Sequence, residues 1–174
     1  LFGNPERSSV RISPDGSMLA FRAPVDGVLN AWVQPIDGDA KVLTNFTDRP
    51  IGGLSFAWNG EQLLFTKDSG GDENNHIYAV DIDDAEVHDL TPMDGVAARM
   101  SGASKDRPDE LVIGINDRDP QYHDLYIVNT RTGEKELLQE NKGYAGYMLD
   151  ADWKVRGRLN MTEDGGMLTE MKNM

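Results

Sequence analysis

The feature that most constrains this sequence is an internal repeat of about 44 to 48 residues. Three short apolar runs carry an aromatic residue at the same place, namely Trp32, Tyr78 and Tyr126, and the successive intervals are 46 and 48 residues. Similar runs recur upstream of each aromatic, at 19–21, 63–65 and 111–113, and downstream, at 42–44, 87–91 and 137–139. Three independent runs that recur at one interval indicate a structural repeat.

Each repeat is predicted to contain four short β-strands. The runs are rich in Val, Ile, Phe, Tyr and Trp, which suit a pleated surface, and turn signals built on Pro and Gly separate them. The first turn is Ser-Pro-Asp-Gly at 13–16, its counterpart in the second repeat is 58–60, and in the third repeat a longer turn is expected over 104–109. No stretch has the sustained apolar stripe of an amphipathic helix.

Four-stranded units at intervals of about 40 to 50 residues are typical of β-propeller blades. The sequence therefore predicts an all-β, partial β-propeller of about three four-stranded blades plus part of a fourth. The blades are expected at approximately 1–44, 45–92, 93–141 and, in part, 142–174, and Trp32, Tyr78 and Tyr126 are expected at equivalent places, each packed between neighbouring sheets. A β-sandwich is the alternative, but a sandwich would not repeat the same aromatic and turn positions. The methionine-rich stretch 167–174 leaves the last strand undefined.

The charge and the residue content exclude several classes of function. The 174 residues include 30 Asp and Glu against 17 Lys and Arg, a net charge of -13, which disfavours nucleic acid as a partner. No apolar run approaches the ~18 residues of a membrane span. With no cysteine, disulfides, thiolate metal sites and cysteine nucleophiles are excluded. The sequence does not decide between a periplasmic and a cytoplasmic location. Because the chain starts at Leu1, it is expected to be a processed or trimmed product.

Six segments together resemble a known family: 1–7, 12–16, 29–33, 71–78, 89–92 and 116–126. The most specific are Asp-Glu-Asn-x-His-x-Tyr at 72–78 and Asn-Asp-Arg-Asp-Pro at 116–120. They resemble the N-terminal β-propeller of bacterial serine peptidases of the prolyl oligopeptidase family, and the resemblance runs from Leu1 to about Gly166. The Ser-Pro-Asp-Gly turn is shared with many propellers, those of the TolB type included.

The resemblance implies an accessory role for this chain. Members of that family join the propeller to a C-terminal α/β-hydrolase domain, whose Ser-Asp-His triad has its nucleophile in a Gly-x-Ser-x-Gly turn. That pentapeptide is absent here, and the nearest match, 102–106, lacks the second glycine. The catalytic domain is thus absent from this chain, and we assign no catalytic residue, metal ligand or cofactor. We expect the propeller to cover and gate the active site of a peptidase acting on short peptides, with the hydrolase domain and peptides as partners.

A second interpretation is a TolB-type propeller that binds protein partners and carries no hydrolase activity. Either way, the chain alone is not expected to be an enzyme. Because a propeller cut open leaves sheet faces and edges uncovered, we also expect self-association through the open blade edges.

The residues that carry chemistry elsewhere favour structural roles here. The three histidines, His76, His88 and His123, fall in separate places, and equivalent positions in different blades rarely meet. The acidic pairs at 72–73 and 83–84 lie in predicted turns and do not follow a calcium loop. The cluster Asp117, Arg118, Asp119 and Asp124 is interpreted as a loop salt-bridge network, with a substrate-facing role as the alternative. The acceptor patterns for glycosylation at Asn45 and Asn160 are taken as chance.

Overall fold

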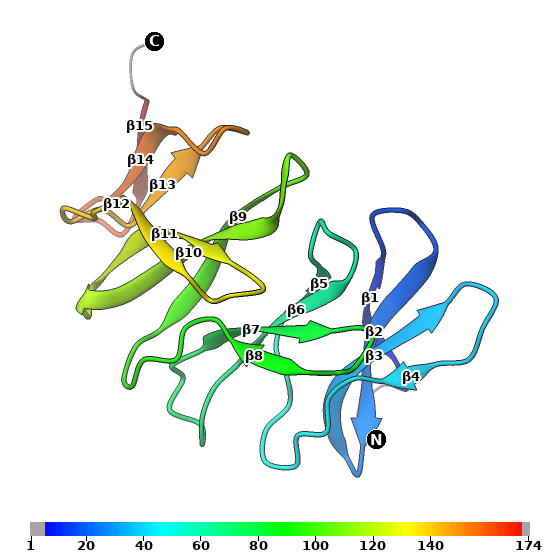
Figure 1. The fold of residues 1–174 in the computed structure, drawn as a ribbon. Coiled ribbons are helices and arrows are strands. Elements are labelled where there is room, and N and C mark those ends of the chain that lie inside the picture. Colours follow the sequence, from blue (N-terminus) through cyan, green and yellow to red (C-terminus); the bar gives the residue numbers. More distant parts are fainter. Residues whose placement is uncertain (1–5, 172–174) are drawn as a thin grey trace.

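A computed structural model describes residues 6–171, which contain fifteen strands and no helix (Figure 1). The strands form four antiparallel sheets that follow one another along an arc. Each sheet is a meander, because its strands are neighbours in chain order. The predicted all-β fold, three four-stranded blades followed by part of a fourth, is confirmed. The described residues hold no helix long and apolar enough to cross a bilayer.

The four sheets have these bounds. Sheet 1 comprises β1 (Ser8–Ile12), β2 (Met18–Val25), β3 (Val28–Pro35) and β4 (Lys41–Val42). Sheet 2 comprises β5 (Leu54–Phe56), β6 (Gln62–Lys67), β7 (His76–Asp81) and β8 (Val87–Asp89). Sheet 3 comprises β9 (Ala98–Ser104), β10 (Arg107–Asp119), β11 (Tyr122–Asn129) and β12 (Lys135–Gln139). Sheet 4 comprises β13 (Gly146–Leu149), β14 (Val155–Met161) and β15 (Met167–Met171).

The predicted turns follow from local chemistry, with two corrections. Gly16 and Gly60 adopt φ of 76° and 73°, the left-handed conformation that glycine tolerates. The turn in the third repeat is shorter than expected, because β9 ends at Ser104 and β10 starts at Arg107. Pro108 fits inside β10 because the pairing with β9 jumps from Arg107 to Leu111, so that no partner needs its missing N–H. Within the stretch 167–174, for which no strand was defined from the sequence, Met167–Met171 form β15, and residues 172–174 lie outside the described part of the chain.

The apolar core lies in three layers between neighbouring sheets, which we call seams 1, 2 and 3. Seam 1, between sheets 1 and 2, contains Leu63 and Phe65 of β6. Leu64 of the same strand points the other way, into seam 2 between sheets 2 and 3. Seam 3, between sheets 3 and 4, is smaller and is built on Val112, Leu125 and Trp153. Because each inner sheet is covered on both faces, its strands are apolar on both faces and the alternation is blurred.

The repeated aromatics occupy one register position in the first three sheets. Trp32 pairs with Phe21, Tyr78 with Phe65, and Tyr126 with Ile113. Tyr78 and Tyr126 pack into seams 1 and 2, each against the preceding sheet. Trp32 is different: it stacks on Phe21 and belongs to none of the three seams, so the expectation that all three pack between sheets is wrong for Trp32.

Polar contacts also join the sheets. The Lys41 ammonium donates to the backbone carbonyls of Ile82 and Asp83 at 2.8 and 2.7 Å. The Arg131 guanidinium of sheet 3 pairs with Glu61, beside sheet 2, at 2.6 Å. These contacts and the seams fix the relative positions of neighbouring sheets.

Candidate functional site

The three histidines are not brought together. His76 and His88 both belong to sheet 2, where they contact different carboxylates: His76 Nδ1 lies 2.8 Å from Asp89 and His88 Nε2 lies 2.9 Å from Asp81. His123 lies on β11 of sheet 3, and burial, followed by the nearby Arg99, lowers the pKa of its imidazole. Within residues 6–171, no group of three His, Cys, Asp or Glu side chains is arranged to hold a metal ion.

The acidic pairs in the turns are engaged with their own backbone. The Asp72 carboxylate accepts the N–H of Asn74 at 3.0 Å, and the Asp84 carboxylate accepts the N–H of Glu86 at 2.9 Å. Such contacts, two residues along the chain, are typical of turns built by aspartate. Glu73 is exposed and has a φ of 61°. Nothing in these turns indicates a ligand.

The charged cluster forms the expected salt bridges in part: Arg118 pairs with Asp124, and Asp117 pairs with Lys135 of β12 at 3.1 Å. Both guanidinium contacts of Arg118 to the buried Asp124 are short, at 2.8 and 2.9 Å, and they lower the pKa of that carboxyl group. Asp124 also accepts the N–H of Asn141 at 2.6 Å, so the network ties the β10–β11 hairpin to the segment after β12. Asp117 accepts the hydroxyl of Tyr126, and burial together with this carboxylate raises the pKa of Tyr126 to about 12. Asp119 accepts the N–H of Gln121.

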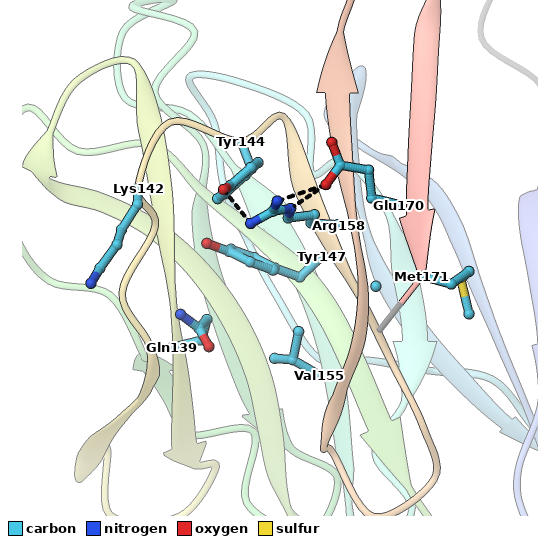
Figure 2. Close-up of a pocket in the computed structure, with 9 residues that line it drawn as sticks. Gln139, Lys142, Tyr144, Tyr147, Val155, Arg158, Glu170 and Met171 are labelled. Carbon is cyan, nitrogen blue, oxygen red and sulfur yellow. Dashed lines mark hydrogen bonds and ion pairs between the residues drawn. The ribbon is translucent and has the colours of Figure 1, made fainter. Parts of the chain in front are cut away.

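A cleft of about 460 Å³ opens between sheets 3 and 4 (Figure 2). Residues of β12 and of the connection to β13 form one side, and β14 and β15 form the other. Tyr147 and Val155 form its apolar surface, and Met171 points away from the tyrosines. The full lining is Gln139, Lys142, Tyr144, Tyr147, Val155, Gly157, Arg158, Glu170 and Met171.

The cleft exists because sheet 4 departs from the repeat. In sheets 2 and 3, the cross-strand pairs that face the preceding sheet are Phe65–Tyr78 and Ile113–Tyr126. In sheet 4 the pair on this face, in register with Tyr147, is Arg158–Glu170. An ion pair therefore stands where the other seams hold large apolar side chains, and a cavity remains beside it.

The charges in the cleft are unevenly paired. The Arg158 Nε donates to Glu170 at 2.7 Å, its guanidinium lies 4.4 Å from the centre of the Tyr144 ring, and it also contacts the Tyr144 hydroxyl. Glu170 raises the pKa of Arg158, and burial raises that of the Tyr147 hydroxyl. Lys142 is exposed, and its ammonium has no hydrogen-bond or ion-pair partner within residues 6–171. Asn160, one of the glycosylation patterns, donates to Glu170 at 2.7 Å.

Sequence reasoning missed this cleft. The runs at 137–139 and 167–174 contain Gln139 and Met171, but no lining residue was assigned a function from the sequence. The signal lies in the strand register, where Arg158 and Glu170 stand at the positions that Ile113 and Tyr126 hold in sheet 3. A charged pair at a position that is apolar elsewhere in the repeat is the kind of local violation that marks a site.

The four sheets define a propeller segment, and comparisons with known proteins show that it is similar to part of a peptidase. No family model matches the chain. Over 169 residues, or 95% of this chain, it is 43% identical to dipeptidyl aminopeptidase BIII of Pseudoxanthomonas mexicana. The chain spans 24% of the length of that relative.

Solved structures support the fold. A puromycin-hydrolyzing peptidase of Mycobacterium tuberculosis superposes on 88% of this chain, and on 28% of its own, with a TM-score of 0.63 at 13% identity. TolB of Acinetobacter baumannii superposes on 94% of this chain, and on 40% of its own, with a TM-score of 0.59 at 22% identity. The resemblance drawn from the sequence is confirmed: the chain is similar to a dipeptidyl aminopeptidase over 95% of its own length, and its fold is similar to those of a peptidase and of TolB.

Proposed function

We propose that this propeller segment covers and gates the active site of a serine peptidase that acts on short peptides. The observation that carries the proposal is the relationship to dipeptidyl aminopeptidase BIII, which extends over nearly the whole chain. The packing supports a gate, since three apolar seams and the ion pair between Arg131 and Glu61 hold neighbouring sheets together as a wall. The proposed partners are a hydrolase domain in the same polypeptide and the peptides admitted to it.

A TolB-type propeller that binds protein partners is the second candidate. The similarity in fold to TolB favours it, although 22% identity speaks for the fold alone. The two candidates differ in one observable property, which is whether the complete polypeptide reacts with a serine-directed fluorophosphonate.

Two experiments test the proposal. The chain of 174 residues should not cleave dipeptidyl chromogenic substrates above background. Turnover that survives repurification and is blocked by a fluorophosphonate would contradict a non-catalytic role. The complete polypeptide that contains these residues should react with the fluorophosphonate and cleave short peptides, whereas a polypeptide that does neither would favour the TolB-type candidate.

A further inference from the structure

The starting point is the difference between seam 1 and seam 3. In seam 1 the Phe65 and Tyr78 rings stack at 5.3 Å with an angle of 9°, and the Phe46 ring meets Phe65 edge-on at 5.9 Å. The Lys67 ammonium lies 5.0 Å from the centre of the Phe46 ring. Seam 1 thus contains a cation over a ring, an edge-on contact and a stacked pair.

Seam 3 repeats only part of this arrangement. Tyr144 takes the place of Phe46: Asn141 holds its backbone N–H and carbonyl at 2.8 and 2.9 Å, as Asn30 holds those of Phe46 at 2.8 and 3.0 Å. The Arg158 guanidinium lies over Tyr144 as Lys67 lies over Phe46, and Tyr144 meets Tyr147 edge-on at 5.8 Å. The stacked pair has no counterpart, because its positions hold Arg158 and Glu170. Arg158 and Glu170 thus stand in place of both stacked rings, so aromatic packing is absent beside the cleft, and a bound ring would supply it.

The polar groups at the cleft indicate what accompanies that ring. Arg158 and Glu170 neutralise each other, which leaves Lys142 as the lining charge without a partner within residues 6–171 (Figure 2). Lys142 is one of the residues that line the cleft, and an ammonium group attracts a carboxylate. The backbone of this connection is held in place by Asn141, so Lys142 extends from a fixed anchor.

We propose that the cleft of seam 3 binds an aromatic residue that has a carboxylate beside it, as at the C-terminus of a peptide. The ring packs against Tyr147 and Val155 and restores the aromatic packing of seam 1, and the carboxylate accepts from the Lys142 ammonium. The site lies between sheets 3 and 4, and the inference goes beyond the proposed function, which assigns no ligand to this cleft. Aromatic packing supplies the affinity and Lys142 the selectivity.

The test is an NMR titration of the 174-residue chain with N-acetyl-phenylalanine. For a ligand of this size we expect an affinity of about millimolar order. The largest amide shifts should fall on Tyr147, Gly157 and their neighbours. N-acetyl-phenylalanine amide and N-acetyl-alanine should each bind more weakly, by about threefold or more. In N-acetyl-aspartyl-phenylalanine amide the carboxylate belongs to the neighbouring side chain. This ligand therefore distinguishes a C-terminal carboxylate from a side-chain carboxylate beside the ring.

Three variants make the test specific. Lys142→Gln should abolish the preference for the acid over its amide, whereas Lys154→Gln, which changes an exposed lysine paired with Asp152, should leave it intact. Val155→Phe should fill the cleft and abolish binding while the remaining amide spectrum stays folded. Shifts that are scattered over the surface, or an acid preference that survives Lys142→Gln, would overturn the proposal. Should Val155→Phe not fold, the two lysine variants decide the question.

Discussion

Phe65→Ala tests the argument that the seams hold this propeller together. Phe65 is fully buried (0% exposed) in seam 1, stacked on Tyr78 and contacted edge-on by Phe46. Truncation to Ala removes the apolar area of the ring and leaves a cavity between two sheets that inter-sheet contacts keep from closing. Substitutions of this kind cost about 3 to 5 kcal/mol. We expect the upper half of that range, because two ring contacts are lost together.

The assay is urea unfolding followed by circular dichroism. With a slope of about 2 kcal/mol/M, a loss of about 4 kcal/mol lowers the midpoint by about 2 M. Trp58→Ala is the matched control, since this aromatic side chain is 47% exposed, and its loss should change stability by only about 0.5 kcal/mol. A loss below about 1 kcal/mol for Phe65→Ala, or one equal to that of the control, would refute the reasoning that seam 1 is a packed core.

Two further predictions concern the network and the open face. Arg118 lowers the pKa of the Asp124 carboxyl group. The ion pair therefore contributes its full stabilisation above about pH 4, the ordinary pKa of a carboxyl group, and this stabilisation is lost as the pH falls through the lowered pKa. Asp124→Asn should therefore destabilise the chain by about 1 to 3 kcal/mol at neutral pH but not in strong acid, and equal losses at both pH values would contradict this account. The face of sheet 4 that points away from sheet 3 exposes Met148, Met161 and Met167 at 40%, 63% and 63%, and we expect it to bind a second copy of the chain. Light scattering should show self-association that Met161→Glu weakens, and a monodisperse monomer would contradict this expectation.

The fold could be predicted because the evidence for the repeat comes from many residues together. Trp32, Tyr78 and Tyr126 recur at one interval, and turns such as 13–16 punctuate it, so errors at single positions do not change the conclusion. The residues at which strands begin and end could be predicted less well from the sequence. The position of Pro108 inside β10 depends on a jump in pairing with β9, which is a property of two strands and not of either alone.

The cleft could not be predicted from single motifs. Arg158 and Glu170 are 12 residues apart in the chain and look like ordinary surface charges. They become notable only in the cross-strand register, which sets them opposite each other on the face toward sheet 3. The same holds for Trp32, whose equivalence to Tyr78 was predictable, whereas its half-buried place outside the three seams was not.

The central claim is that this propeller gates a peptidase. The most direct measurement compares cleavage of a short peptide with cleavage of a long unfolded polypeptide that contains the same scissile sequence, in the complete polypeptide that includes these residues. We predict a strong preference for the short peptide, which falls when Phe65→Ala loosens seam 1 while the rate on the short peptide is retained. Equal cleavage of both substrates by the unaltered protein would contradict the gating role.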